Sequence, residues 1–221
     1  MDAGADASDF LFDGPSSSPV RLILCHGAGA PMDSPFMNRV ARGVAADGFR
    51  VARFEFPYMR ARRTGGRAGA PDRPPVLRQA WLDAIGAIRS DAAADGGRDG
   101  DPRIFVGGKS LGGRVASMVA DEARVAGLVC LGYPFHPPGR PEKLRTAHLE
   151  NLETRALFVQ GTRDPFGTRE EVGGYRLSPR IALHWLSDGD HSWKPRASSG
   201  RTEAQNLEEG IAAVAAFLKT S

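Results

Sequence analysis

The sequence predicts an α/β protein in which helices cover both faces of a mostly parallel sheet. Apolar runs of strand length alternate along the chain with amphipathic stretches of helix length, which is typical of strand–helix–strand units. Several of these runs are apolar throughout, as strands buried on both faces are. The 221 residues, 41% of them hydrophobic, suffice for one compact core. We therefore expect a single domain over residues 19–221, preceded by a tail or short strand over residues 1–18.

The apolar pattern places each element in turn. Strands are predicted at residues 20–25, 50–56, 103–106, 127–131, 156–160 and 181–185. Helices are predicted at residues 35–47, 76–95, 111–122, 168–173 and 203–219. In the last helix, Leu207, Ile211 and Val214 recur at helical spacing and form one apolar face. Residues 60–75 are rich in Gly, Pro and Arg and are expected to form an exposed loop.

The composition excludes several kinds of partner. The net charge is only +3 and most arginines are scattered, so no surface for nucleic acid is expected. No window is long and apolar enough for a membrane span, and the acidic N-terminus lacks the basic and apolar regions of a secretory signal. Cys25 and Cys130 fall in apolar runs and are expected to be buried free thiols, which fits a cytoplasmic protein.

Residues 108–112, Gly-Lys-Ser-Leu-Gly, match G-x-S-x-G, a turn that exposes a serine between a strand and a helix. The context fits, because an apolar strand ends just before this motif and a helical stretch follows it. The flanking glycines let neighbouring backbones approach closely. Ser110 is therefore the predicted nucleophile. A phosphate-binding loop is the rival interpretation, but it needs a glycine at the position of Arg103.

A Gly-rich segment from Cys25 to Gly29 follows the first strong strand, where an oxyanion-binding loop belongs in such a site. The expected amide donors are Gly27 or Ala28, together with Leu111, the residue after the nucleophile. His26 is expected to shape this loop by hydrogen bonding rather than to act as a base. A plain glycine turn is the alternative.

An acid and a histidine follow Ser110, each in a loop after a later strand. Asp164 comes just after the fifth predicted strand, and His191 just after the sixth. Because parallel strands end at the same edge of a sheet, these loops should meet beside Ser110. His191 is the predicted general base and Asp164 the carboxylate that orients it. Asp188 and Asp190 are rivals for the acid, although acids so near the histidine in sequence are ordinarily turn formers.

The remaining histidines have other expected roles. His184 alternates within a strand and His148 lies in a polar, helix-like stretch, so both are expected to be structural. His136 is a loop residue near the predicted site. No His, Cys, Asp or Glu cluster has metal-ligand spacing, and no G-x-G-x-x-G follows a strand. Neither a metal nor a cofactor is therefore expected.

Motifs along nearly the whole chain are similar to those of the α/β-hydrolase superfamily. They are LILCHGAGAPMDS, FEFPYMRARR with PDRPPVL, GGKSLGGRVAS, LGYPFHPPG, FVQGTRDPFG and SDGDHSW. Together they resemble a narrower group, the small dienelactone-hydrolase-like bacterial proteins related to a testis-expressed protein and to a subunit of a histone acetyltransferase complex. The resemblance implies the α/β-hydrolase fold and the triad Ser110, Asp164 and His191.

The sequence also departs from these relatives at two places. Dienelactone hydrolases proper use a cysteine nucleophile where this chain has Ser110. The long insertion that forms a helical cap in many relatives is missing after the strand at residues 127–131. No large cap domain is therefore expected.

The leading functional hypothesis is hydrolysis of an ester, thioester or amide through an acyl-enzyme, as in a small carboxylesterase. The alternatives are acyl transfer to another acceptor and a non-catalytic interaction module that keeps the fold. An intact triad argues against the module. The expected partner is a small-molecule acyl substrate with a short or medium acyl group, because no cap would cover a long chain.

Six side chains on loops at the carboxyl ends of the strands are expected to line a shallow apolar site. They are Tyr58, Met59, Tyr133, Phe135, Phe166 and Trp193. Anchoring of the loops is the alternative role for these side chains. The arginines after Tyr58 are either a site for an anionic group or part of a solvated loop. They are Arg60, Arg62, Arg63, Arg67 and Arg73.

Overall fold

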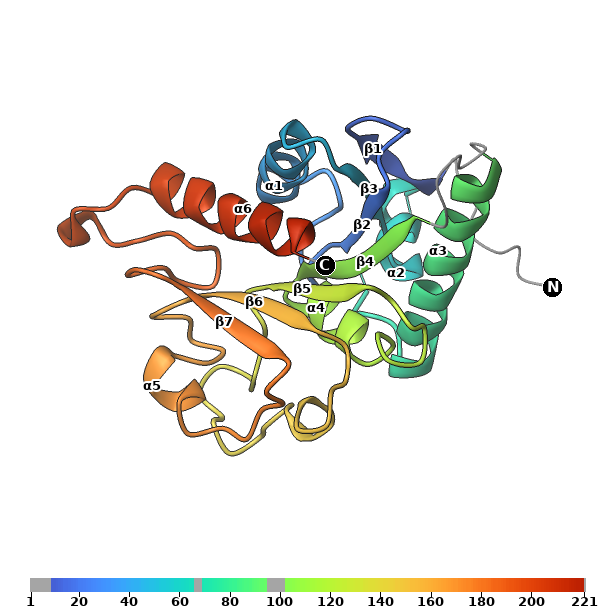
Figure 1. Cartoon of the computed structure of the whole chain (residues 1–221). Helices are drawn as coiled ribbons and strands as arrows, with labels where there is room; N and C mark the ends of the chain where they lie inside the picture. The colour runs from blue at the N-terminus through green and yellow to red at the C-terminus, as the bar shows by residue number, and fades with distance from the viewer. Residues whose placement is uncertain (1–8, 66–68, 95–101, 221) are drawn as a thin grey trace.

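A seven-stranded sheet forms the centre of the computed structural model, which describes residues 9–65, 69–94 and 102–220 (Figure 1). The strand order is β1-β3-β2-β4-β5-β6-β7. The strands are β1 (Leu11–Asp13), β2 (Val20–Cys25), β3 (Arg50–Phe54), β4 (Arg103–Lys109), β5 (Gly127–Leu131), β6 (Ala156–Gly161) and β7 (Ile181–Leu186). Strands β2 to β7 run parallel, and β1 pairs antiparallel with β3. The predicted mostly parallel sheet is confirmed.

The strands in the middle of the sheet are buried on both faces. Every residue of β2, β5 and β6 is buried, in keeping with their continuous apolar runs. Cys25 and Cys130 lie in two of these strands as buried free thiols. Burial raises the pKa of both thiols well above its ordinary value.

Helices cover both faces of the sheet (Figure 1). They are α1 (Pro35–Ala46), α2 (Pro57–Arg63), α3 (Pro74–Ala94), α4 (Leu111–Ser117), α5 (Arg169–Val172) and α6 (Glu203–Lys219), with 3₁₀ turns at Ala147–Leu149 and Ala197–Ser199. Helices α1 and α6 pack on one face of the sheet, where Met37 and Leu207 join apolar side chains of the strands. Helices α3 and α4 pack on the other face, around Trp81 and Val115. Two core clusters therefore hold the sheet between two helical layers, and the described residues form no large cap domain.

Helix α4 is shorter than predicted. It spans Leu111–Ser117 rather than residues 111–122. The amides of Met118 and Val119 donate to carbonyl oxygens three residues back, at 3.0 and 3.1 Å. The chain therefore tightens into turns after Ser117 instead of continuing as an α-helix.

The described residues of the segment 60–75 are largely exposed, as their composition predicted, but they do not form a loop throughout. Helix α2 covers the first part of this segment and begins at Pro57, whose fixed φ and missing N–H suit a first helical position. Within α2, Met59 is buried and Arg63 donates to the Glu55 carboxylate from two nitrogens, at 2.8 and 2.9 Å. Composition predicted the exposure but not the helix, because Arg63 also pairs with carboxylates of the fold while 39% of its side chain stays exposed.

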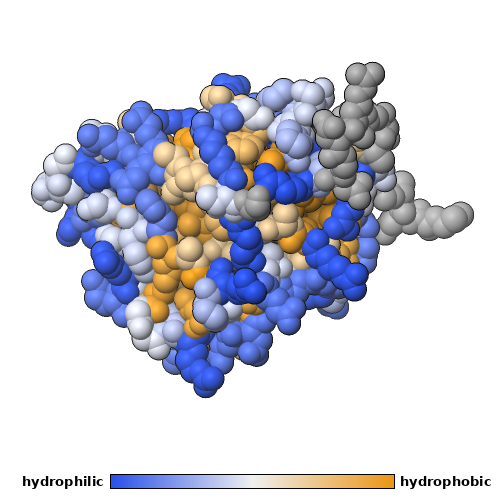
Figure 2. All heavy atoms as spheres, in the orientation of Figure 1, coloured by the Kyte–Doolittle hydropathy of each residue, from blue (hydrophilic) through white to orange (hydrophobic). Residues whose placement is uncertain are grey.

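Hydrophilic side chains surround the face of the molecule that Figure 2 shows, and hydrophobic ones appear in its middle. Three large hydrophobic side chains of the described residues, Leu11, Val76 and Leu144, are classed as exposed. Over the same residues, no helix has both the length and the apolar character needed to cross a membrane.

Candidate active site

Ser110 lies at the turn between β4 and α4. Its φ is 51° and its ψ is −109°, a conformation that non-glycine residues rarely adopt. A Cβ on Gly108 would lie 2.2 Å from the carbonyl oxygen of Cys25, and a Cβ on Gly112 would lie 2.4 Å from the same oxygen. Both glycines are therefore required by the close approach of the end of β2. This is the strained turn that is typical of G-x-S-x-G.

Three side chains from three loops form one hydrogen-bonded chain. The Ser110 Oγ lies 2.9 Å from the His191 Nε2, and the His191 Nδ1 lies 2.8 Å from the Asp164 Oδ2. Asp164 follows β6 and His191 follows β7, so the parallel strands bring both to the edge where β4 ends at the serine turn. The Asp164 side chain is fully buried, whereas 20% of the His191 side chain is exposed. Hydroxyl, imidazole and carboxylate thus stand in the order that general-base activation of a serine needs.

The carboxylate of Asp164 is held by two further donors. Its Oδ1 accepts the amide of Phe166 and its Oδ2 accepts the Gln160 Nε2, both at 2.9 Å. Gln160 is buried near the end of β6, and its side chain also bonds the amide and the carbonyl of Tyr133, at 2.7 and 3.2 Å. It therefore ties the acid loop to the end of β5. Gln160 was not among the predicted site residues, and its one signal in the sequence is an amide side chain within an otherwise apolar run.

The surroundings of His191 favour the neutral imidazole. Burial lowers the pKa of His191 from the ordinary value of histidine, and the nearby Lys109 ammonium lowers it further. The hydrogen bond to Asp164 acts in the opposite direction but does not offset the burial. The imidazole also packs against the ring of Phe166, with centroids 4.2 Å apart. His191 is therefore suited to accept a proton at neutral pH.

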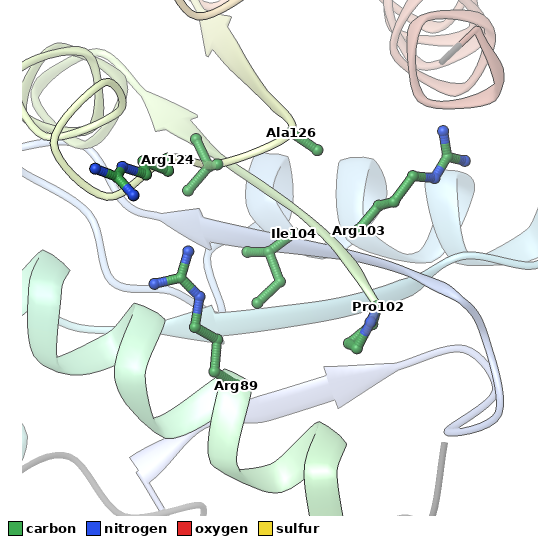
Figure 3. Close-up of a pocket in the computed structure, with 7 residues that line it drawn as sticks. Arg89, Pro102, Arg103, Ile104, Arg124 and Ala126 are labelled. Carbon is green, nitrogen blue, oxygen red and sulfur yellow. The ribbon is translucent and has the colours of Figure 1, made fainter. Parts of the chain in front are cut away.

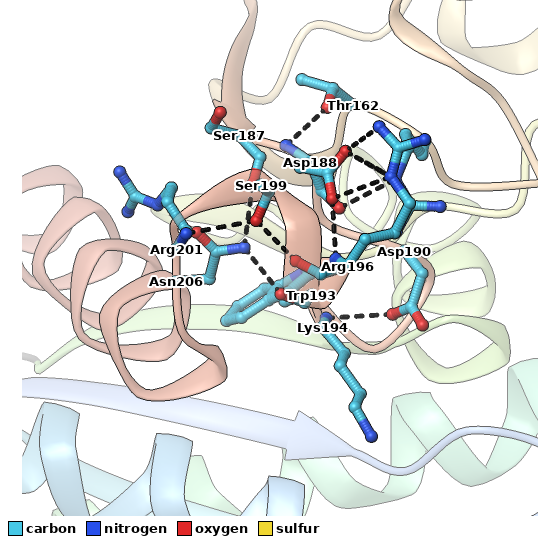
Figure 4. Close-up of polar contacts among 11 residues, drawn as sticks. Thr162, Ser187, Asp188, Asp190, Trp193, Lys194, Arg196, Ser199, Arg201 and Asn206 are labelled. Atoms are coloured by element: carbon cyan, nitrogen blue, oxygen red, sulfur yellow. Dashed lines mark hydrogen bonds and ion pairs between the residues drawn. The ribbon is translucent and has the colours of Figure 1, made fainter.

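The loop that carries His191 is fastened on both sides (Figure 4). Asp188 and Trp193 flank the histidine with φ values of 54° and 69°. The Asp188 carboxylate accepts a backbone amide at 2.7 Å and a guanidinium from the segment that follows the loop. The buried Asn206 Nδ2, from α6, donates to the carbonyl oxygens of Ser187 at 3.1 Å and Trp193 at 2.8 Å. These bonds hold the loop that carries the imidazole of His191.

The rival acids have other partners. The Asp190 Oδ1 accepts the amides of Ser192 and Lys194 at 2.8 and 3.0 Å, as a turn-forming aspartate does. The hydrogen bonds from Arg196 lower the pKa of Asp188 to about 2. In the described part of the chain, no hydrogen bond joins either carboxylate to His191.

His26 shapes the loop after β2. Its Nε2 accepts a backbone amide from the loop after β3 at 3.2 Å, so Nδ1 carries the proton and donates to the carbonyl oxygen of Gly27 at 2.6 Å. Because the two ends of a trans peptide point in opposite directions, the Ala28 amide then points away from His26. The Tyr58 hydroxyl holds the Ala28 carbonyl at 3.0 Å. Leu111 is the first residue of α4, where an amide has no partner within its helix.

A pocket of about 580 Å³ opens beside Ser110 and His191. Its walls come from the loop after β2, the start of α1, the His191 loop and the start of α6. Its larger apolar lining residues are Phe36, Met37, Phe166 and Leu207, and its charged ones are Arg39, Lys109 and Glu203. The predicted oxyanion residues Gly27 and Ala28 line the same pocket. The serine hydroxyl thus faces a largely apolar space with few charges.

Most of the side chains expected to line this pocket lie elsewhere. Tyr58, Met59, Tyr133, Phe135 and Trp193 are buried in the core. Their loops fold back onto the sheet, and the expectation for these five is wrong because they anchor the loops. Phe166 does border the pocket, against the imidazole.

The arginine-rich segment does not reach the pocket. Arg60 pairs with Asp9 at 2.9 Å, and Arg63 pairs with an aspartate of the loop after β2 at 2.6 Å. Arg62 lies over the ring of Tyr58. The described arginines of this segment, Arg60, Arg62, Arg63 and Arg73, are absent from the pocket lining, and Arg67 lies outside the described residues. An anion-attracting role for the segment therefore has no support from its position.

A second hollow, of about 350 Å³, lies at the start of β4, at the opposite end of that strand from Ser110. Figure 3 shows the guanidinium groups of Arg89 and Arg124 on one side of it, while Arg103 extends away. Arg103 donates to a carbonyl oxygen of α6 at 3.5 Å. The three cations do not converge on one point, and the residues that line the hollow include no acid or nucleophile.

The histidines other than His26 and His191 have partners outside the hydrogen-bonded chain of Ser110, His191 and Asp164. Their partners among other side chains are Glu171 for His136 at 3.4 Å, Ser117 for His148 at 2.8 Å and Glu209 for His184 at 3.1 Å. Over the residues that the structure describes, no group of three or more His, Cys, Asp or Glu side chains could hold a metal ion.

The fold and this site together define an α/β hydrolase. Residues 18–219 match the family model described as "Alpha/beta hydrolase domain", and the chain belongs to that family. The predicted superfamily is thereby confirmed.

Solved structures of the same fold include a serine hydrolase without a lid from Xanthomonas campestris, with a TM-score of 0.69 and 18% identity over 96% of this chain and 90% of that one. An α/β serine hydrolase homologue from Coxiella burnetii has a TM-score of 0.67 and 17% identity over 97% and 92%. A dienelactone hydrolase from Anabaena variabilis has a TM-score of 0.64 and 16% identity over 98% and 94%. At these identities the likeness concerns the fold.

Proposed function

We propose that this protein is a serine hydrolase that cleaves an ester, thioester or amide through an acyl-enzyme. The observation that carries the proposal is the hydrogen-bonded chain from Ser110 through His191 to Asp164, at 2.9 and 2.8 Å. The strained turn presents Ser110 to a pocket, and the buried carboxylate fixes the imidazole tautomer that leaves Nε2 free to accept a proton.

In the proposed reaction, the Ser110 Oγ attacks the acyl carbon while the His191 Nε2 takes its proton. The imidazolium then protonates the departing alcohol, thiol or amine, which leaves the acyl group on the serine. Water, deprotonated by the same nitrogen, attacks the acyl-enzyme, and the proton returns to Ser110 as the acid is released. Asp164 remains ionised and stabilises the imidazolium in both steps.

The oxyanion of each tetrahedral intermediate needs backbone donors beside the serine. We assign this role to the amides of Ala28 and Leu111, with Gly27 as the alternative on the first loop. The contact between His26 and the Gly27 carbonyl supports this assignment, because it turns the next amide away from the core. Preorganised donors of this kind act without reorganisation cost during the reaction.

The pocket favours a substrate with an apolar acyl group of short or medium length. Phe36, Phe166 and Leu207 supply apolar walls beside Ser110, and the residues that the structure describes form no large cap domain that would extend them. Among the proteins of similar fold, the Anabaena protein is a dienelactone hydrolase, and Est1E from Butyrivibrio proteoclasticus has been solved with ferulic acid bound. Both names are consistent with small carboxylic acid derivatives as the first compounds to assay.

A fluorophosphonate probe tests the nucleophile directly, because it reacts with an activated serine whatever the natural substrate is. Ser192 lines the same pocket and provides a matched control. We expect labelling of the wild type and of Ser192→Ala, and none of Ser110→Ala. Equal labelling of Ser110→Ala would overturn the assignment, and an unreactive wild type would favour the non-catalytic module.

A panel of short and medium acyl esters and thioesters then tests turnover. Ser110→Ala should lower kcat by a factor of about 10³ to 10⁶ while leaving thermal unfolding unchanged. Adding alcohols or amines to the assay and measuring ester or amide products separates hydrolysis from acyl transfer.

A further inference from the structure

Lys109 immediately precedes the nucleophile, and its ammonium turns toward the His191 loop. The Lys109 Nζ donates to the carbonyl oxygen of His191 itself. The same nitrogen lies 5.5 Å from the centroid of the Phe36 ring. One side chain therefore connects the serine turn to the backbone of the residue that would accept the serine proton.

A glycine makes room for this contact. Gly132 follows β5 with a φ of 70°. A Cβ at this position would lie 2.8 Å from the Lys109 Nζ and 3.4 Å from the His191 Nδ1. The Lys109 ammonium and the His191 imidazole thus both border the space that the absent side chain of Gly132 leaves. The distance between the Lys109 Nζ and the His191 Nδ1 is therefore no more than the sum of these two distances.

The charge of Lys109 is costly where it lies. Burial lowers the pKa of the ammonium to about 8, although the charges of Asp164 and Asp190 act in the opposite direction. In the part of the chain that the structure describes, no carboxylate lies within ion-pair distance of it. Lys109 is half-buried at the wall of the pocket, and a partly buried charge without an ion pair costs stability unless its hydrogen bonds compensate. A neutral apolar side chain would avoid this cost, so the lysine calls for an explanation other than stability.

We infer that Lys109 is a positioning residue for His191: its ammonium ties the histidine backbone to the serine turn, and its positive charge disfavours the imidazolium. The inference rests on the proposed function, since it assigns a role in controlling the same site. Lys109 itself does not touch the reacting atoms in this scheme.

Four other charged groups surround this pair. Asp164, from the loop after β6, and Asp190, from the His191 loop, both favour the imidazolium and so oppose Lys109. Arg39 of α1 and Glu203 of α6 lie on the walls of the adjoining pocket with opposite charges. Lys109 is the cation that lowers the pKa of His191.

Removing this charge should raise the pKa of His191. Two unit charges about 6 Å apart shift a pKa by about 0.5 units in water and by about 2 units at an effective dielectric constant of about 20. The acid limb of kcat/KM should therefore move to higher pH by about 0.5 to 2 units in Lys109→Met and Lys109→Gln. Gln keeps an N–H donor whereas Met has none, so kcat on the alkaline plateau should fall less in Lys109→Gln than in Lys109→Met.

Arg163 offers a matched control. Its Nε donates to the carbonyl oxygen of Asp188 at 3.0 Å, so it too is a cation bonded to the backbone of the His191 loop. Its charge pairs with the Asp188 carboxylate at 2.9 Å. Arg163→Met should loosen the same loop without moving the acid limb.

The titration of His191 is also measured by NMR in the Ser110→Ala background, which needs no turnover. A His191→Gln variant assigns the signal among the five histidines. A higher pKa in both Lys109 variants, and an unchanged one in Arg163→Met, supports the inference. An unchanged pKa in folded Lys109→Gln overturns it, as does an equal shift in Arg163→Met. These outcomes are distinct from a failure of the proposed function, which appears as the absence of Ser110-dependent activity in the wild type.

Discussion

Two helical glycines allow a matched test of how α6 supports the histidine loop. Gly210 lies within α6, and a Cβ there would come within 2.6 Å of the Trp193 Cζ3 and 3.0 Å of its Cη2. Gly86 lies within α3, and beyond its chain neighbours and the nearby backbone of its own helix a Cβ there would meet nothing within 4 Å. The same change to alanine therefore meets a buried indole at one site and open space at the other.

The two substitutions should have opposite effects on the free energy of unfolding. In an exposed helix interior, alanine is favoured over glycine by about 0.5 to 1 kcal/mol, so Gly86→Ala should stabilise the protein by about that amount. Gly210→Ala has the same local advantage, but overpacking of a close-fitted core costs about 1 to 3 kcal/mol. The Trp193 side chain cannot easily move to make room for the added methyl group, because it is fully buried and its ring packs on Phe36 with centroids 4.9 Å apart. We expect a net destabilisation of about 1 to 2 kcal/mol for Gly210→Ala.

Thermal and urea unfolding of the two variants measure this difference. For a chain of this size, 1 kcal/mol corresponds to about 2 to 4 °C in Tm. Gly86→Ala should therefore raise Tm by about 1 to 4 °C and Gly210→Ala should lower it by about 2 to 8 °C. Since Trp193 flanks the His191 loop, Gly210→Ala should also lower kcat at a temperature where it is fully folded. A Gly210→Ala protein as stable as Gly86→Ala would refute the packing argument.

Three further predictions concern the chemistry of the site. Asp164→Asn should lower kcat by about 10³ to 10⁴, because an amide holds the wrong imidazole tautomer. Asp190→Asn should lower kcat only slightly. The reverse ranking in an ester assay would assign the role of the acid to Asp190. In the wild type, the acid limb of kcat/KM should have its midpoint below about pH 6.5. Burial lowers the pKa of His191, so activity is lost only as the pH falls through that lowered pKa. A midpoint above about pH 6.5 would contradict this prediction. EDTA should leave turnover unchanged, and a loss that zinc restores would show a metal that the sequence did not predict.

Most of the fold could be predicted because buried strands have a recognisable apolar pattern in the sequence. Strands buried on both faces read as unbroken apolar runs, and β2, β5 and β6 are of this kind. The meeting of Ser110, Asp164 and His191 follows from the same pattern, since each residue comes directly after a parallel strand. The order of the strands across the sheet cannot be derived from the sequence pattern. The prediction that the three residues meet requires only that their strands run in the same direction.

The pocket could not be predicted in the same way. An aromatic residue on a loop near the carboxyl end of a strand can face the substrate or fold back onto the core, and the local sequence is the same in both cases. Tyr133 stacks on Phe158 with centroids 4.9 Å apart, and Trp193 fills the space above a glycine of α6. The actual walls include Phe36 and Leu207, which belong to helices that are remote in sequence from the serine turn. Their position depends on how α1 and α6 pack together, which no local pattern encodes.

Helices α1 and α6 therefore both line the pocket and support the loop that carries His191. Phe36 lines the pocket on one side and packs against Trp193 on the other, and Asn206 of α6 holds the carbonyl of that same tryptophan. A group that fills the pocket therefore contacts the aromatic layer that supports the His191 loop. In this protein the pocket wall is part of the core, so a substitution that reshapes the pocket at Phe36 also changes the support of the proposed general base, His191.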